Sequence, residues 1–424
     1  MENYTYRLIS FCGFIILLGI AWITGTRNRI KIETILGSIF LAWALGALTF
    51  WSTESRSILE WINDVLIALL KASHKGALFI FGPLALGPGQ TLADGTPSVG
   101  FVLAFQVFPS VIFFSAMLGG LYNLGIMQKV VKLFSKAFNR ILFLSGAESL
   151  AAAVNLFVGI ESGLTVRPYL AKMTRSELLT LMTCMMATVA STVMGIYVIA
   201  LQKTFPNIAG HLVSASLISI PCSILTSKLF YPELEKPETF GKLKEDTIET
   251  SHTGLISALV EGGYQGVKIA IGIATVLIIV LGLEALLDLI LGKLPEFQGQ
   301  PLSALRLLGW LTYPFTVLLG LRPEEWGMAS QVLGSRFIET EVSAYFSLAA
   351  LQTTDNAFTM RSLTIMTYGL CGFVHIASMG IFVGGLSALV PSRANEISIV
   401  GLQALWTSFL ATLLTGCIAG SLVI

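Results

Sequence analysis

The chain has 424 residues with 26 Lys or Arg and 25 Asp or Glu, so only 12% of its residues are charged and its net charge is +1. A soluble chain carries about 25% charged residues. With 54% hydrophobic residues and a mean hydropathy of +0.79, this chain has too few polar side chains to cover a surface in water. These values exclude a soluble enzyme and a disordered protein, and they leave no basic field for nucleic acid.

Apolar runs of membrane-spanning length recur along the chain. About 20 apolar residues cross the hydrocarbon layer as a helix. Eight runs reach this length, namely 8–26, 34–53, 102–127, 178–202, 204–227, 268–293, 362–392 and 397–424. The first is not a cleaved signal peptide, because its positive residues at 27, 29 and 31 follow the apolar run instead of preceding it. The sequence predicts an all-α, multi-pass membrane protein with eight transmembrane helices.

Two segments between the spans have a different character. Residues 57–71 place Trp61, Val65 and other apolar side chains opposite Glu60 and Asp64, which predicts an amphipathic helix lying in the outer membrane interface. Residues 231–253 form the sizeable polar loop of the chain and are interpreted as a solvated cytoplasmic linker.

The positive charges predict how the chain is oriented. Lys and Arg gather in the connections 27–31, 129–140, 167–175 and 228–244. The positive-inside rule places these connections in the cytoplasm, so both termini are expected outside the cytoplasmic membrane of a bacterium.

Residues 142–168 cannot be an ordinary span, because charged cytoplasmic connections flank them on both sides and the segment must therefore enter and return. They also mix polar residues with Gly146, Gly159 and Gly163. We expect a re-entrant hairpin of two short helices buried in protein. Residues 331–356, with Arg336 and Glu339 among other polar residues, predict a second hairpin from the outer side.

The segments after the two hairpins resemble each other. Residues 174–198 and 360–383 share the frame R-S, M-T and M-G-I-aromatic-V, and both have a middle of small and polar residues. Chance similarity between apolar segments is the alternative. Two copies of a hairpin followed by an interrupted helix, one from each side, predict an inverted repeat with a site near the membrane midplane.

Longer motifs resemble those of a known family. They are F-Q-V-F-P-S-V-I-F-F-S-A (105–116), L-G-I-M-Q-K-V-V (124–131), S-G-A-E-S-L-A-A-A-V-N-L-F-V-G (145–159), R-P-Y-L-A-K-M-T-R-S-E-L (167–178) and Y-G-L-C-G-F (368–373). The chain resembles the concentrative nucleoside transporters from its first span to its C-terminal C-I-A-G. The resemblance implies eight spans, two re-entrant hairpins, a homotrimer in membrane lipid, and nucleoside uptake coupled to Na⁺ or H⁺ without an organic cofactor.

The resemblance also implies a sodium site. The family combines a hairpin Asn with a carbonyl and hydroxyls of the following helix, and the matching positions here are Asn155, Ala187, Thr188 and Thr192. Na⁺ is a hard cation that prefers such oxygen ligands. Threonines bonded to their own helix backbone are the alternative.

Base recognition in the family comes from a Gln-Thr-Glu run at the tip of the first hairpin. This chain has Ile160, Glu161 and Ser162 there, in a segment one residue shorter than usual. Ile160 replaces an amide that can donate and accept, so the contacts of that amide with the base are lost. The substitution puts base specificity in doubt.

Sugar recognition in the family uses a Glu in the second hairpin and an Asn and a Ser in the helix beyond it. The matching residues are Glu341, His375 and Ser378, with His375 in place of the Asn. A carboxylate accepts bonds from two sugar hydroxyls, and an imidazole donates or accepts one. Alternatives for His375 are a structural bond between helices or a proton-linked step. Glu148 is interpreted as a structural residue of the first hairpin.

Five parts are expected along the chain, namely a scaffold part at 1–140, a first transport repeat at 141–230, a linker at 231–267, a scaffold span with an outer interfacial segment at 268–325, and a second transport repeat at 326–424. The sequence predicts a secondary transporter that imports nucleosides by symport. One alternative is the same fold with an altered substrate, such as a modified nucleoside or a nucleobase. The other is an intramembrane enzyme that uses Glu161, Glu341 and His375.

Overall fold

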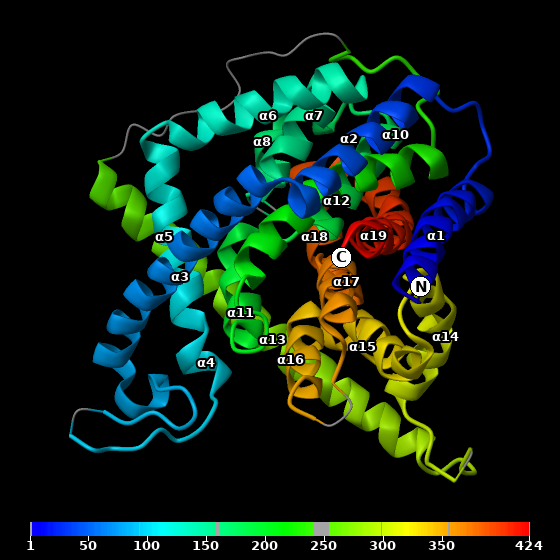
Figure 1. The fold of residues 1–424 in the computed structure, drawn as a ribbon. Helices are drawn as coiled ribbons and strands as arrows, with labels where there is room; N and C mark the ends of the chain where they lie inside the picture. The colour runs from blue at the N-terminus through cyan, green and yellow to red at the C-terminus, as the bar shows by residue number, and fades with distance from the viewer. Residues whose placement is uncertain are drawn as a thin grey trace.

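The computed structural model describes residues 2–92, 94–157, 159, 161–240, 254–297, 299–354 and 357–423, with the side chains of residues 2–3, 53–56, 161 and 164 left out. Within these ranges the chain is α-helical, with three short 3-10 helices and no β-strand (Figure 1). The prediction of an all-α protein is therefore confirmed.

The amino-terminal part consists of α1 (Glu2–Thr24), α2 (Ile32–Trp51), α3 (Thr53–Phe81), α4 (Leu103–Gln106), α5 (Phe108–Asn123) and α6 (Ile126–Leu142). Many large apolar side chains on these helices are exposed, for example Phe40 at 68% and Phe79 at 91%. Such a surface is stable only against lipid or another protein.

The rest of the chain forms two groups of helices, a first half before and a second half after a long helix. The first half consists of α7 (Gly146–Val154), α8 (Glu161–Thr165), α9 (Arg167–Leu170), α10 (Arg175–Ala187), α11 (Ser191–Leu201) and α12 (Ile208–Phe230). The second half follows α13 (Leu255–Leu291) and consists of α14 (Ala304–Leu318), α15 (Trp326–Glu339), α16 (Glu341–Leu351), α17 (Met360–Leu370), α18 (Ile376–Leu389) and α19 (Ala394–Leu422).

Eight helical segments of the described chain are long and apolar enough to cross a membrane, which is the predicted number. The eight segments are not all the predicted ones, and they differ in two places. The run 362–392 is not counted among them, because residues 371–375 separate α17 from α18, which agrees with the interrupted helix expected at 360–383. Residues 57–85 are of membrane-spanning length and composition, whereas the sequence analysis used only 57–71 and placed them in the interface. That interfacial position stays a prediction.

The helix α13 is longer than predicted. It begins at Leu255, inside the expected linker of residues 231–267, and its 37 residues correspond to about 55 Å. The hydrocarbon layer is about 30 Å thick, so a helix of this length must tilt or extend beyond it. Glu261 did not end the helix, since its side chain is exposed.

Each hairpin is tied at its base to the helix that follows it. In the first half, Ser145 caps α7 and donates its hydroxyl to Glu177 Oε1 of α10 over 2.5 Å. In the second half, the Ser362 hydroxyl of α17 donates to Glu325, at the start of the second hairpin. Both carboxylates are buried, so each bond fixes a hairpin to its partner helix.

The two hairpins start at opposite ends of α19. Arg393 at the beginning of α19 donates to the carbonyls of Leu170 and Met173, beside the base of the first hairpin. Near the other end, Arg361 donates to the carbonyl of Gly420 in α19 and to that of Gly320, just before the second hairpin. The 29 residues of α19 span about 43 Å, so the two predicted hairpins start far apart, at opposite ends of this helix; re-entry from opposite sides of the membrane stays a prediction.

The interrupted helices cross at their breaks. The α10–α11 break is residues 188–190, and the α17–α18 break is residues 371–375. A Cβ on Gly372 would lie 2.9 Å from the carbonyl oxygens of Met186 and Ala187, so only glycine permits this approach. The close packing of the breaks brings irregular backbone from both halves to one place.

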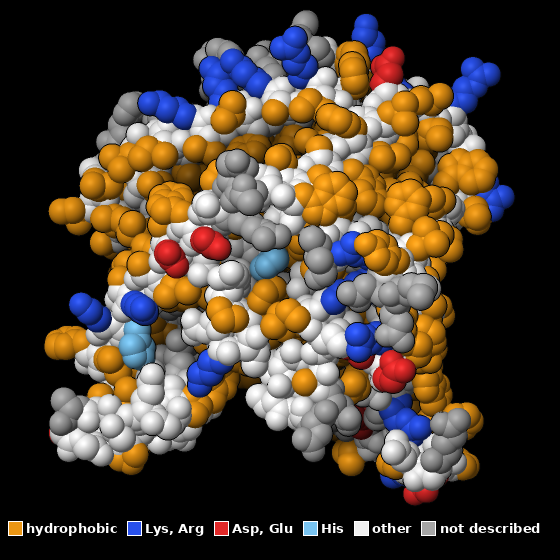
Figure 2. Space-filling model, in the orientation of Figure 1, with side chains coloured by type: hydrophobic (Ala, Val, Ile, Leu, Met, Phe, Trp, Pro, Cys, Tyr) orange, Lys and Arg blue, Asp and Glu red, His pale blue; other side chains and the backbone are white. Residues whose placement is uncertain are grey.

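The connections rich in Lys and Arg lie together on one side of the molecule. Thr26 donates from its backbone to Phe230, and Lys172 pairs with Glu238 over 2.8 Å. Figure 2 shows Lys and Arg side chains along the upper edge of the molecule and hydrophobic side chains below them. Both chain ends lie away from this edge and near each other, with Arg7 donating to the Val423 carbonyl (Figure 1).

Candidate functional site

A cavity of about 350 Å³ lies where the hairpin tips and helix breaks meet α13. Its lining comes from five places in the chain. They are Gly159 of the first hairpin, Thr340, Glu341 and Val342 of the second, Ala190, Thr192 and Val193 at the first break, Phe373, His375, Ser378, Ile381 and Phe382 at the second, and Gln265, Lys268, Ile269, Gly272, Ile273 and Val276 of α13. The volume suits a small polar molecule.

Glu341 begins α16 at the tip of the second hairpin and is buried in the cavity wall. Its Oε1 accepts a hydrogen bond of 2.9 Å from the Tyr197 hydroxyl of α11. Its Oε2 lies 2.9 Å from His375 Nε2. A carboxylate held by two groups is fixed in position, and it keeps further acceptor capacity for a ligand.

His375 connects this carboxylate to the second break. It is the N-cap residue of α18, and its Nδ1 accepts from the Ser378 amide over 3.1 Å. Because Nδ1 accepts, neutral His375 carries its proton on Nε2, which faces Glu341. Asn is a common N-cap, so His in this position retains the cap and also reaches Glu341.

Ser378 lines the cavity, but its hydroxyl is already used within the break. It donates to the carbonyls of Phe373 and His375. In this structure Ser378 therefore acts on the backbone around His375, and a contact with a ligand would have to use its oxygen as an acceptor.

The backbone next to Glu341 is strained. Thr340, the single residue between α15 and α16, has φ 90° and ψ 162°, a region that glycine occupies almost alone. Such strain costs about 1 to 3 kcal/mol and persists only where the surroundings enforce it. It fixes the sharp turn that places Glu341 at the tip of the hairpin.

Three of the four predicted sodium ligands, Asn155, Ala187 and Thr188, lie at the first break. Asn155 is fully buried, and neither side-chain atom has a hydrogen-bond partner among the described residues. The Thr188 hydroxyl lies 3.1 Å from the Asn155 carbonyl and 2.8 Å from that of Cys184. The Ala187 carbonyl accepts from Ser219 and retains a second lone pair.

A cation fits this group of atoms. A buried amide oxygen without a partner costs about 1 to 3 kcal/mol, and Na⁺ would satisfy it together with the carbonyl and hydroxyl oxygens nearby. Thr192, the fourth predicted ligand, lines the larger cavity instead of showing a bond to these atoms. The helix-capping alternative for Thr188 also holds, because its hydroxyl reaches Cys184 in its own helix.

Within the described part of the chain, no residue predicted to contact the base is found in the lining of the cavity. Ile160 and the side chain of Glu161 lie outside the described residues. Ser162 is fully buried, its hydroxyl has no described partner, and it does not line the cavity. The structure therefore brings together the sugar-side residues but does not bring Ser162 to them.

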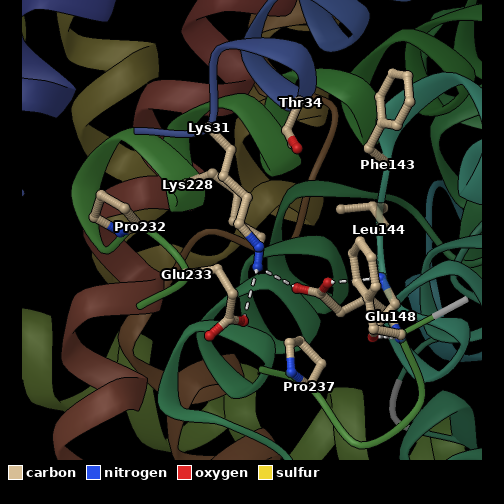
Figure 3. A pocket seen from close by; sticks show the side chains of 11 residues that line it. Lys31, Thr34, Phe143, Leu144, Glu148, Lys228, Pro232, Glu233 and Pro237 are labelled. Carbon is tan, nitrogen blue, oxygen red and sulfur yellow. Dashed lines mark hydrogen bonds and ion pairs between the residues drawn. The ribbon is translucent and has the colours of Figure 1, made fainter. Parts of the chain in front are cut away.

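Glu148 is part of a buried charge cluster at the base of the first hairpin (Figure 3). Its carboxylate pairs with Lys228 at the end of α12. Lys228 also donates to the Ser176 hydroxyl over 2.9 Å and lies 3.7 Å from Glu233. Because these contacts join the hairpin to α10 and α12, Glu148 lies in the hairpin anchor and away from the cavity.

Sequence reasoning missed several residues at the site. Tyr197 lies in the M-G-I-aromatic-V frame, but only the fold brings it to Glu341, and it stacks on Tyr345 with ring centroids 4.5 Å apart. Gln265 and Lys268 line the cavity from α13. No signal in the sequence linked α13 to the hairpins.

A helical membrane protein whose two interrupted helices meet at a mostly apolar cavity with a few buried polar groups has the architecture of a secondary transporter. No group of three or more potential metal-ligating His, Cys, Asp or Glu side chains occurs in the searched part of the chain.

Comparison with known proteins identifies the family. Residues 12–84 match the family described as Na⁺ dependent nucleoside transporter N-terminus, residues 211–420 match its C-terminus, and residues 104–204 match a nucleoside recognition "Gate" domain. An uncharacterized transporter of Haemophilus influenzae is 32% identical, with 97% of each chain covered. The putative nucleoside permease NupX of Escherichia coli is 30% identical, also with 97% of each covered.

A solved structure of CNTnw in an inward-facing, substrate-bound state is similar at a TM-score of 0.88 and 30% identity, covering 98% of this chain and 99% of that one. The chain belongs to the concentrative, Na⁺ dependent nucleoside transporter family. Because this is a family of transporters, the prediction that the chain is not an enzyme is confirmed.

Proposed function

We propose that this chain imports nucleosides across the cytoplasmic membrane of a bacterium by symport with sodium. Membership of the family supports nucleoside symport, and the described substrate-bound state of CNTnw shares the fold. The observation that carries the proposal is the cavity that contains the Glu341 and His375 pair and is walled by both repeats.

In this proposal the sugar of the nucleoside lies against Glu341, His375 and Ser378. Sugar hydroxyls donate to the carboxylate, which is otherwise held by Tyr197 and His375. The base extends toward the first hairpin, where Ile160, Glu161 and Ser162 remain the predicted neighbours.

Sodium is proposed to bind at Asn155, Ala187, Thr188 and Thr192. The buried and unpartnered amide of Asn155 supports this site. Ions that occupy the first break would order the backbone beside the cavity, which gives a physical link between cation and substrate binding. Coupling to H⁺ through His375 is the competing proposal.

We further propose a homotrimer whose scaffold holds the two transport repeats, with the five-part division of the chain given above. The exposed apolar side chains of α13, such as Ile278 at 74%, support a lipid-facing or subunit-facing role. The shared side of the Lys and Arg connections supports a cytoplasmic location for them and both termini outside.

Counterflow in proteoliposomes tests the proposal. Labelled uridine should accumulate unchanged when the vesicles are preloaded with uridine, and sodium should increase the rate. Dependence on a pH gradient without an effect of sodium would assign coupling to H⁺. Failure of a broad panel of nucleosides to exchange would refute nucleoside transport.

A further inference from the structure

One face of α13 lines the cavity, and this face is polar toward the start of the helix and apolar further along it. Its lining residues recur at helical spacing, from Gln265 and Lys268 through Ile269 and Gly272 to Val276. The first two are polar and the others are apolar or lack a side chain. A Cβ on Gly272 would have no atom within 4 Å, so there is open space one turn beyond Lys268.

The ionisable groups of the lining are Glu341, His375 and Lys268. Glu341 and His375 are paired with each other. Lys268 has no ion pair among the described residues, and its own helix offers no acidic residue three or four positions away, where Tyr264, Gln265, Ile271 and Gly272 stand. Among the ionisable groups that line the cavity, the amino group of Lys268 is therefore the one without a charged partner in the described part of the chain.

An unpaired cation within a membrane helix is costly unless water or an anion meets it, and such residues mark substrate pathways. A neutral nucleoside offers no countercharge. A nucleoside with a single negative charge would pair with Lys268 while its sugar contacts Glu341 and His375. The loss of the base-reading amide at Ile160 also leaves base contacts to be supplied from elsewhere, and Gln265 and Lys268 are polar groups of the same cavity.

We infer that Lys268 makes this transporter selective for nucleosides whose base carries one negative charge. The charge is that of a carboxylate on a pyrimidine ring or of a purine ring ionised at neutral pH. One lysine balances one charge, so a doubly charged phosphate is a poorer match. This inference rests on the proposed nucleoside transport and names its substrate class.

Matched pairs of nucleosides test the inference. Orotidine differs from uridine by a ring carboxylate, and xanthosine differs from guanosine in having a base that ionises near neutral pH. Uptake of each is measured in proteoliposomes for the native chain and for Lys268→Gln, Lys268→Arg and Lys293→Gln. Lys293 is exposed just beyond the end of the same helix, so its variant controls for the loss of a positive charge.

The native chain should prefer the anionic member of each pair. Lys268→Gln should reduce that preference, measured as the ratio of uptake of the anionic to the neutral member of each pair, at least tenfold, equivalent to about 1.4 kcal/mol. Lys268→Arg and Lys293→Gln should keep the preference. Uridine uptake without any preference for the anionic member, or a preference that survives Lys268→Gln, would overturn the inference and leave the proposed function standing.

Varying the lipid composition distinguishes an anionic nucleoside from the headgroup of an anionic lipid as the partner of Lys268. The same assays are run in vesicles of zwitterionic lipid and in vesicles containing anionic lipid. An effect of Lys268→Gln on anionic nucleosides in both supports the inference. An effect only with anionic lipid would assign the lysine to a lipid headgroup and would overturn it. Absence of uptake for all four nucleosides would instead contradict the proposed function.

Discussion

The two contacts of His375 can be separated by substitution. Its Nδ1 caps α18, and its Nε2 holds the buried carboxylate of Glu341. Asn at position 375 should retain the cap but is too short to reach Glu341, whereas Ala should lose both. The stability lost in His375→Asn therefore measures the Glu341 contact, and the further loss in His375→Ala measures the cap.

The expected magnitudes follow from the contacts. The 2.9 Å contact of His375 Nε2 with Glu341 Oε2 involves a buried carboxylate, so we assign it about 1.5 to 3 kcal/mol, the range for a hydrogen bond to a charged group. An N-cap contributes about 0.5 to 2 kcal/mol. We expect His375→Asn to lower the free energy of unfolding by about 1.5 to 3 kcal/mol, and His375→Ala by about 2 to 5 kcal/mol.

Equilibrium denaturation in mixed detergent micelles, followed through the fluorescence of the seven tryptophans, measures these values. His74→Asn in α3 is the control, because His74 does not line the cavity. A His375→Asn protein as stable as the native chain would refute the contribution of the Glu341 contact. Equal stability of the Asn and Ala variants would refute the contribution of the cap.

Three further predictions concern the site and its anchor. Glu341→Gln should abolish uptake without changing the oligomeric size, because the amide nitrogen of Gln cannot accept a hydrogen bond from a sugar hydroxyl. Undiminished uptake would show that Glu341 is not part of the site. Asn155→Leu should raise the sodium concentration needed for half-maximal uptake at least tenfold. It should also remove the stabilisation by sodium that a thermal unfolding assay detects in the native chain. An unchanged response to sodium would show that the ion binds elsewhere. Lys228→Met should lower the free energy of unfolding by about 3 to 5 kcal/mol, since it leaves Glu148 charged and buried, and adding Glu148→Gln should recover part of this loss. Strictly additive effects in that pair would show that the two side chains do not interact.

The sequence predicted the features that depend on local composition. Charge-free length identified the helices, and flanking charges with interspersed glycines indicated the hairpin at residues 142–168. The small and polar middle of residues 174–198 indicated an interrupted helix, and the structure breaks it at residues 188–190.

Several features could not be predicted in this way. The helix α13 extends back to Leu255, because an exposed charged side chain such as that of Glu261 does not interrupt a helix. The run 362–392 breaks at residues 371–375, as an interrupted helix was expected to do, but the sequence did not predict that Gly372 packs there against the other break. Length and charge carry no information about such packing.

The candidate site likewise contains residues that were predicted and residues that only the structure revealed. Resemblance placed Glu341, His375 and Ser378 in one region, and the structure places all three on one cavity wall. The double use of His375, the Tyr197 bond and the lining from α13 were not predictable, because they join distant parts of the chain.

The sequence by itself determined that this protein crosses a membrane as helices, and roughly where those helices begin and end, because partition into lipid depends on each segment's own composition. Only the tertiary structure decided which polar groups meet inside it. Tyr197 and Glu341 are 144 residues apart, and Lys228 and Glu148 are 80 apart. Such contacts arise from packing between distant segments, within one repeat for Lys228 and Glu148 and between the two repeats for Tyr197 and Glu341, so no single segment encodes them.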